Sequence, residues 1–428
     1  MAARLSVAKG LVAALVASVL LLPVTGLASS SKTEIDDILD GLAGLAFDEF
    51  VDASYKEILK RTPEMVTSLG LSEELGMRDD RLDTICYDFA LETYELEEGI
   101  LELLQGYDRE ALGYEQQVSY DSYTWIIEGW LEERNWMYHF YPVHHGFSRQ
   151  NELFRFLEDE HPLETRQNVE DYISRLGQVD DQFACLESNM ADSQARGIMA
   201  PGQMLQRAAD QSRWVVPGVA RDTPFYTNLL SSIGEVEGLT LAERQQYLRD
   251  AEEAINESVI PAYQSLVAAI DEQVPVAPPM NGAWQLPDGE AFYASRVRHH
   301  TTTDMTPAEI HQRGLDEVDR IRAEIRQHFD DLGYPGEVGF QELYQRVGQD
   351  SGIVRAEDIV AYNEHLIRQA KEDLREVFDI EPVADVIIIG GAGGGFYVAG
   401  SLDGSRPGAY YIGNQQDTYR FWMPTILY

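Results

Sequence analysis

Lysine is the residue type that this chain most conspicuously lacks. Only five of its 33 basic residues are lysines, whereas 73 residues are acidic and the formal net charge is −40. A surface of this charge repels nucleic acid and anionic membranes, so we expect neither as a partner. Scarce lysine with excess acid is typical of proteins that work in high salt, where screening relieves repulsion between like charges. An acidic secreted protein from an ordinary environment would look the same, and the composition leaves both interpretations open.

Cysteine is also scarce, because Cys86 and Cys185 are the two in the chain. Two cysteines so far apart do not match the spacing of a zinc site. A chain of 428 residues can bury a core large enough to fold without a covalent link. We therefore favour two separate buried thiols over a disulfide.

One long apolar stretch, Gly10 to Leu22, lies near the N-terminus, after the basic residues Arg4 and Lys9. Small residues follow it up to Ala28, which predicts a secretory signal peptide over residues 1–28. Pro23 interrupts a run already short for a bilayer, so we expect no stable membrane insertion after signal cleavage. No cysteine follows the run, so a lipid anchor is not supported. The predicted location is secreted, or periplasmic and associated with the cell envelope.

The motifs of common hydrolases and nucleotide-binding proteins are missing. The sequence contains nine histidines but no HExxH, no GxSxG and no GK[ST]. His144-His145 and His299-His300 are adjacent pairs, whose side chains diverge, and Glu364-His365 has no second histidine at helical spacing. A complete zinc site therefore cannot be assembled from this chain, and we assign it no metal ligand, no catalytic residue and no bound cofactor.

Glycines are concentrated at residues 390–395, directly after an apolar stretch typical of a strand. This resembles the start of a dinucleotide-binding fingerprint. However, Phe396 stands where the third glycine belongs, and Phe396 to Val398 has the pattern of another strand rather than of a helix. We therefore predict a glycine-rich hairpin or loop.

Helical periodicity dominates the rest of the chain. It predicts helices from Thr33 to about Gly106 and a single long helix from Val169 to Leu186. The aromatic-rich block from Tyr114 to Phe140 is expected to supply core side chains rather than a cleft. Gly218 to Gly238 is predicted as a loop, and Val274 to Thr303 as a proline-rich crossover.

Two helix starts are predicted by capping boxes, at Thr240 and Thr306, and a further amphipathic helix is predicted from Ile359 to Val377. The fold class is therefore mainly α, with a large multi-helix body over residues 29–380. A small region of strands and loops near the C-terminus, residues 381–428, is expected to begin a catalytic region.

The strongest candidate site is the loop DGSRPGAYY at residues 403–411. Glycine and proline fix such a loop, arginine offers two parallel donors to a carboxylate, and tyrosines supply hydroxyl groups. The candidate substrate-binding residues are Asp403, Ser405, Arg406, Tyr410 and Tyr411. A tight turn held by an ion pair between Asp403 and Arg406 explains the same residues equally well.

This loop and several other segments together resemble the bacterial family catalogued as domain of unknown function 885. The resemblance extends over nearly the whole mature chain, and its further segments are ARGIMAP (195–201), LPDGEAFY (286–293), HHTTTDMTPAEIHQRGLDEVDRI (299–321) and the terminal TILY (425–428). It implies a secreted or envelope-associated, largely helical protein similar to zinc metallopeptidases of the gluzincin kind. The glycine run at 390–395 departs from the family pattern.

In that family, the stretch corresponding to MPTILY leads into a metal motif of the form HExxPGHH. Its histidines would bind zinc and its glutamate would activate the attacking water. We therefore expect this sequence to be the N-terminal part of a secreted zinc-dependent peptidase-like hydrolase, inactive as given. Zinc and a peptide or small-molecule substrate are expected in a full-length form. The alternative is a secreted binding or scaffold protein without catalytic activity.

Overall fold

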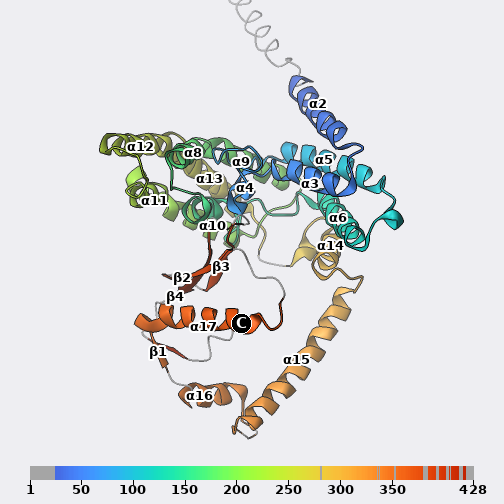
Figure 1. Cartoon of the computed structure of the whole chain (residues 1–428), viewed down its shortest axis with the longest axis vertical. Coiled ribbons are helices and arrows are strands. Elements are labelled where there is room, and N and C mark those ends of the chain that lie inside the picture. Colours follow the sequence, from blue (N-terminus) through green and yellow to red (C-terminus); the bar gives the residue numbers. More distant parts are fainter. Residues whose placement is uncertain are drawn as a thin grey trace, which may run out of the picture. The chain divides into compact units, whose positions relative to one another are not determined.

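The computed structural model describes residues 25–279, 282–334, 336, 338–350, 353–378, 384–391, 395–401, 404, 406–413 and 418–420. Its elements are mainly helices, with short strands near the C-terminus, so the predicted fold class is confirmed (Figure 1). The chain divides into two compact units, one made of Met1–Arg61 and Thr84–Phe140, the other of Thr62–Asp83 and Tyr141–Tyr428. Most of the predicted signal peptide and the terminal segment 421–428 lie outside the described residues.

The first unit is a helical bundle of α2 (Thr25–Leu42), α3 (Phe47–Leu59), α5 (Tyr87–Gln105) and α6 (Tyr114–Glu133), with short 3₁₀ turns η1 (Arg109–Ala111) and η2 (Arg134–Trp136). Helix α5 packs against α2, α3 and α6. Apolar residues at helical spacing form one buried cluster, as the periodicity requires. Its members are Ile35, Leu42, Phe47, Phe50, Ile58, Leu96, Ile100, Leu104, Tyr123 and Ile127.

The aromatic-rich block contributes to this core only in part. Tyr123 is buried, and Tyr120 and Trp130 pack against the cluster. Trp125 and Phe140 are exposed. Helix α6 therefore places some of its aromatic rings in the core and leaves others on the surface.

The second unit begins with α4 (Pro63–Leu69) and continues with the helices that build its body. These are α7 (Arg149–Arg155), η3 (Phe156–Glu160), α8 (Arg166–Leu176), α9 (Val179–Ala195), α10 (Gly202–Val215), η4 (Ala220–Asp222), α11 (Pro224–Ser232), α12 (Leu241–Ala254), η5 (Ile255–Val259) and α13 (Ile260–Gln273). Helix α13 packs against α9 and α10, and α12 packs against α8. The elements η3 and η5 are π-helical turns.

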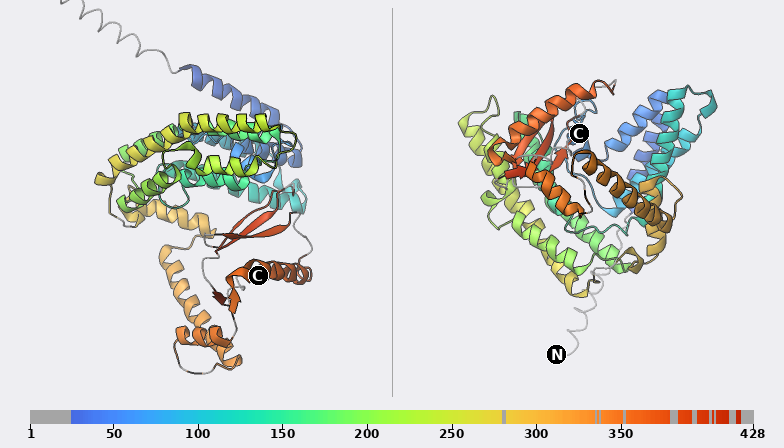
Figure 2. Two further views of the ribbon diagram at one scale, coloured as in Figure 1. Left: turned by 90° about the vertical axis from the view of Figure 1, so that its left-hand side faces the viewer. Right: turned by 90° about the horizontal axis from the view of Figure 1, so that it is seen from below.

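Beyond this body come η6 (Val274–Val276), η7 (Ala283–Gln285), α14 (Gly289–Thr301), α15 (Pro307–Asp331), α16 (Phe340–Asp350), η8 (Ala356–Asp358) and α17 (Ile359–Leu374). In the left view of Figure 2, the long helix α15 is followed by the shorter α16. Thr306 caps α15 and Thr240 caps α12, and both capping boxes are complete. These two predicted helix starts are confirmed, and α17 confirms the predicted amphipathic helix.

Two small sheets complete the second unit. Strand β4 (Gly408–Gly413) lies between β2 (Val386–Gly391), which it pairs with in parallel, and β3 (Phe396–Val398), which is antiparallel to it. Strand β1 (Ile353–Arg355) pairs antiparallel with β5 (Thr418–Arg420). Strands therefore flank the glycine run as predicted. Because β2 and β3 both pair with β4, they do not form a hairpin with each other.

Four local predictions are wrong. The expected long helix breaks between α8 and α9, where the Gln178 side chain donates to the carbonyl of Ser174 at 2.8 Å and so occupies an acceptor at the helix end. The expected loop at 218–238 contains α11, because Thr223 caps a helix with Pro224 at its first position. The expected crossover contains α14. Cys86 and Cys185 are both disulfide-bonded rather than free thiols.

Candidate functional site

A pocket of about 680 Å³ in the second unit is the strongest candidate site. Its wall combines the end of α4 and the following turn, the π-helical turn η3 with residues 161–164, the end of α11, and the segment that precedes β4. The lining residues are Thr67, Gly70, Ser72, Glu73, Asp79, Glu158, Asp159, Glu160, His161, Pro162, Leu163, Glu164, Asn228, Ser231, Ser232, Glu235, Ser401 and Arg406.

The lining is strongly acidic. Its carboxylates are those of Glu73, Asp79, Glu158, Asp159, Glu160, Glu164 and Glu235, whereas Arg406 is the one arginine or lysine among the described lining residues. Burial and the neighbouring Asp159 carboxylate raise the pKa of Glu158. A pocket that concentrates negative charge in this way favours a positively charged ligand group over a negatively charged one.

The turn η3 supplies three of these carboxylates in succession. The backbone N–H of His161 donates to the carbonyl of Phe156 at 2.9 Å, five residues back, which closes the wide turn of a π-helix. Such turns are rare and frequently occur at functional sites. Here the turn brings Glu158, Asp159 and Glu160 to the same pocket wall.

Arg406 lies in the pocket wall, but its guanidinium also binds backbone. Its Nη1 donates to the carbonyl of Ala399 at 2.9 Å, and its Nη2 donates to the carbonyl of Ser68, just before the turn after α4, at 2.8 Å. Its backbone N–H donates to Ser401 Oγ at 2.9 Å. Arg406 therefore ties the segment before β4 to the helical wall of the pocket.

Tyr411 makes the second link between the sheet and this wall. Its hydroxyl donates to Asp159 Oδ1 at 2.7 Å, and its ring stacks on Phe396 of β3 with centroids 4.4 Å apart. Burial and the Asp159 carboxylate raise the pKa of Tyr411. The side chain therefore keeps its proton and donates it in this bond.

The remaining predicted site residues are not all brought to the pocket. Tyr410 is half-buried on β4, and its hydroxyl lies close to Gly395, where an added Cβ would be 3.3 Å away. Neighbouring strand residues point to opposite faces of a sheet, so Tyr410 points away from Tyr411. Asp403 and Ser405 lie outside the described residues, so the alternative ion pair between Asp403 and Arg406 stays a prediction.

A buried arginine, Arg175, contacts residues that line the pocket, and it was not among the residues predicted for the site. Arg175 of α8 is fully buried, and its Nη1 donates to Nδ1 of His161 while its Nη2 donates to Thr67 Oγ1, both at 2.6 Å. His161 and Thr67 line the pocket. Burial lowers the pKa of Arg175 to about 10. One sequence signal exists, since Arg175 interrupts the apolar face that carries Tyr172 and Leu176.

This arginine also fixes the state of His161. Because an arginine can only donate, Nδ1 of His161 accepts, and its Nε2 must carry the proton that is shared with the carbonyl of Asn168 at 3.0 Å. Burial and the adjacent Arg175 lower the pKa of His161 to about 3. His161 is therefore neutral, with both ring nitrogens engaged, and serves the pocket wall rather than proton transfer.

A second buried network stabilises the helices around the pocket. Arg149 forms a bidentate pair with Glu64, at 2.6 Å and 2.8 Å, and its Nε donates to Gln182 Oε1 at 2.7 Å. The backbone N–H of Glu64 donates to Asp83. Burial and the Glu64 carboxylate raise the pKa of Asp83 to about 6. Paired arginine and carboxylate groups of this kind specify one arrangement of the chain.

The described residues do not fit a zinc ion. No group of three or more histidine, cysteine, aspartate or glutamate side chains among them is arranged to hold a metal. Nδ1 of His144 accepts from the backbone N–H of Gly146 at 3.0 Å, and His299 and His300 stack edge to face at the end of α14. His365 is exposed on α17. We therefore derive no reaction step through a metal.

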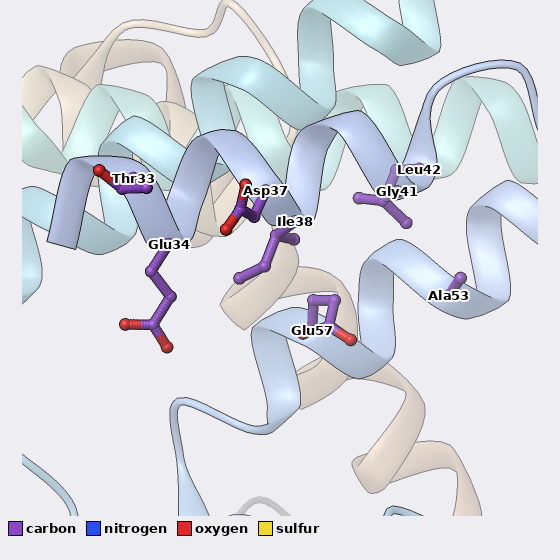
Figure 3. Close-up of a pocket in the computed structure, with 8 residues that line it drawn as sticks. All are labelled: Thr33, Glu34, Asp37, Ile38, Gly41, Leu42, Ala53 and Glu57. Carbon is purple, nitrogen blue, oxygen red and sulfur yellow. The ribbon is translucent and has the colours of Figure 1, made fainter. Parts of the chain in front are cut away.

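A second opening lies in the first unit, between α2 and α3, with a volume of about 800 Å³. Figure 3 shows Glu34 and Asp37 on α2, with Glu57 on α3 across from them. Ile38 and Leu42 supply its apolar lining. Lys60 already pairs with Glu57 at 2.6 Å. This groove contains none of the residues predicted for the site.

The fold and the pocket define a class: a mainly helical protein whose small C-terminal sheet is fastened to the wall of an acidic pocket. Within that class, the chain belongs to the family described as "Bacterial protein of unknown function (DUF885)", which matches residues 63–428. No helix among the described residues is long and apolar enough to cross a membrane. No curated protein matches the sequence.

Two solved structures share the fold. One is described as "the putative lipoprotein from Colwellia psychrerythraea", with a TM-score of 0.79 and 20% sequence identity, over 87% of this chain and 68% of that chain. The other is described as "a putative lipoprotein of unknown function from Shewanella oneidensis", with a TM-score of 0.55 and 15% identity, over 90% of this chain and 67% of that chain. At these identities the likeness establishes the fold alone.

Proposed function

We propose that this chain is the N-terminal, substrate-binding part of a secreted zinc-dependent peptidase-like hydrolase. The observation that carries the proposal is the attachment of the segment around β4 to the acidic pocket through Arg406 and Tyr411. This segment contains DGSRPG, one of the two stretches on which the family resemblance is most specific. Asp403, Ser405, Arg406 and Tyr411 are the proposed substrate-binding residues, whereas Tyr410 points to the other face of the sheet and is not among them.

The charge of the pocket supports a substrate with a positively charged group, such as the side chain of a basic residue or the ammonium group of a peptide N-terminus. Its carboxylates surround a volume of about 680 Å³, which suits part of a peptide better than a whole protein. Two nitrogens of the Arg406 guanidinium already donate to backbone carbonyls, so the first role of Arg406 is to position the segment before β4. Its other N–H groups supply the donors for a substrate carboxylate.

The hydrolytic part of the proposal concerns a longer form of the protein. The zinc ligands and the glutamate that the resemblance implies are not in this sequence, and the described residues offer no substitute for them. We therefore expect the 428-residue chain to bind its substrate without hydrolysing it.

Metal content and turnover test the proposal directly. The 428-residue chain, and the longer product if the reading frame continues past Tyr428, would be purified and compared by elemental analysis and with a library of quenched peptides. We expect zinc and hydrolysis only in the longer product. Stoichiometric zinc with turnover by the 428-residue chain would refute the assignment of the metal ligands to a longer form.

A secreted binding or scaffold protein without catalytic activity is the second candidate, because an acidic pocket can hold a cationic ligand without a metal. The two candidates differ in a simple way. A binding protein has a reading frame that ends without an HExxPGHH motif and binds cationic peptides without cleaving them. A peptidase-like protein has the motif and cleaves what it binds.

The proposed location is secreted or associated with the cell envelope. The N-terminal signal pattern supports it, and so does the disulfide state of both cysteines, because disulfides persist mainly outside the cytoplasm. The related structures are described as putative lipoproteins.

A further inference from the structure

Helix α5 of the first unit carries a carboxylate in the middle of an apolar core. The Glu97 side chain is only 5% exposed, and its neighbours Leu96, Ile100 and Leu104 are fully buried. Glutamate is almost never buried to this degree without a partner. Its position alone therefore requires an explanation that the function proposed above does not provide.

One oxygen of this carboxylate, Oε2, is buried and has no hydrogen-bond partner. A charged group left unpaired in an apolar interior is strongly destabilising, whereas a protonated carboxyl is tolerated at a much lower cost. The geometry therefore favours the neutral, protonated form of Glu97 in the folded bundle.

Arg61 is a cation that acts on this carboxylate, but its guanidinium already has other partners. Arg61 donates from Nε to Thr93 Oγ1 at 2.8 Å, lies 3.6 Å from Glu92 and stacks over the ring of Phe89 at 4.0 Å. Arg61 also interacts electrostatically with the carboxylate of Glu34 on α2. Arg61 therefore offsets the charge of Glu97 only in part.

Helix α6, which also packs against α5, adds a second negative charge that acts on Glu97. Glu133 of α6 acts on Glu97, and burial together with Glu133 raises the pKa of Glu97 to about 7. Tyr123 of α6 shares a hydrogen bond with Ser54 of α3 at 3.0 Å, and Tyr94 lies one turn before Glu97 on α5, near Glu133 and Arg134. Burial raises the pKa of both tyrosines to about 12, so neither ionises near neutral pH.

We propose that Glu97 makes the helical bundle of the first unit sensitive to pH. With a proton on Glu97, α5 packs closely against α3 and α6. Loss of that proton places a second negative charge beside Glu133 in an apolar interior and loosens α5 from α6. The device belongs to the first unit and is independent of the acidic pocket and of the proposed function.

The direction of the effect follows from proton linkage. Below pH 4.5, the ordinary value, both the folded and the unfolded chain keep the proton and Glu97 has no effect. Between pH 4.5 and about 7, the unfolded chain loses it while the folded chain holds it, so the folded-to-unfolded ratio falls. Above pH 7 the loss is complete, and it amounts to a factor on the order of 100.

The test compares the wild-type chain with Glu97→Gln, which keeps the shape and removes the charge. Glu102→Gln is the matched control, because Glu102 is exposed on the same helix. Denaturant unfolding and hydrogen exchange of α5 and α6 peptides would be measured from pH 4.5 to 8.5. The wild type and the control should lose protection as the pH rises, while Glu97→Gln should lose far less. Equal pH dependence in all three proteins would overturn the proposal.

A second measurement needs no variant and covers the case in which Glu97→Gln does not fold. The side-chain carboxyl ¹³C resonance of Glu97 would be titrated by NMR in the wild-type chain. A midpoint near pH 7 supports the proposal, and a midpoint near pH 4.5 contradicts it.

Discussion

The hydroxyl of Tyr411 donates to Asp159 across 252 residues of sequence, at 2.7 Å. This bond joins the central strand of the small sheet to a π-helical turn of the helical body. It lies beside a pocket whose other anchor is Arg406. Hydrogen bonds to charged acceptors are stronger than bonds between neutral groups, so this pair is a suitable first target for mutation.

Tyr411→Phe removes this hydroxyl and leaves the ring stacked on Phe396. Because the bond is partly exposed, we expect a loss of about 1 kcal/mol in the free energy of unfolding. Hydrogen exchange should rise in β4 and η3 together. Tyr397→Phe serves as the control, since Tyr397 is 54% exposed on β3. If exchange in η3 did not change, the bond would have no role in holding the pocket wall.

Arg406→Lys tests the other anchor. Lysine keeps the charge but lacks the planar fork whose two nitrogens donate to the carbonyls of Ala399 and Ser68. We expect nearly unchanged global stability, faster exchange in residues 395–413 and weaker binding of cationic peptides as the wall loosens. In a full-length enzyme, activity should fall as well.

Arg320→Lys is the control for that change, because Arg320 is an exposed α15 residue that pairs with Glu317 and Glu324. Unchanged exchange near the pocket in Arg406→Lys would assign Arg406 to a role outside the anchor.

The neutral state of His161 predicts a pH effect of defined sign. Its pKa is lowered to about 3 from 6.5, so below pH 6.5 the unfolded chain binds a proton that the folded chain does not. Stability is therefore lost as the pH falls from 6.5 towards 3. Imidazole ¹⁵N shifts should report a proton on Nε2 and no titration between pH 4 and 8. A midpoint near 6.5 would contradict the bond from Arg175.

The cysteines predict a chemical result. Both are disulfide-bonded, so a thiol reagent should label neither in the unfolded, unreduced chain and both after reduction. A native disulfide commonly contributes about 2–4 kcal/mol, so the reduced chain should unfold at lower denaturant. A Cys86→Ser, Cys185→Ser double variant should match the reduced protein and should be insensitive to reductant. Labelling of the unfolded chain without prior reduction would restore the thiol interpretation.

Short sequence patterns predicted the features that contacts between nearby residues determine, such as the starts of helices. Thr240 and Thr306 cap their helices because the capping glutamate lies three residues on, within the same turn. The break at Gly177 was missed because apolar spacing continues across it, and Val179 and Phe183 are as deeply buried as Tyr172. Periodicity therefore identified the buried residues correctly and the number of helices wrongly.

The candidate site depends on contacts that no local pattern contains. DGSRPGAYY pointed to Arg406 and Tyr411, but their acceptors on Ser68 and Asp159 are set by tertiary packing. Arg175 was missed for the same reason, since its partners Thr67 and Arg81 lie about a hundred residues earlier. The π-helical turn at Phe156–Glu160 also has no sequence pattern that separates it from an ordinary helical end.

The strand order β2-β4-β3 has a consequence for synthesis on the ribosome. The central strand, Gly408–Gly413, is the last of the three to be made, and both earlier strands pair with it in the described structure. Until it emerges, residues 386–391 and 396–398 have no sheet to join, although the helices of the body can already pack. Assembly of the pocket wall is therefore a late step, and a nascent chain stalled before residue 408 exposes two unpaired strands to other chains.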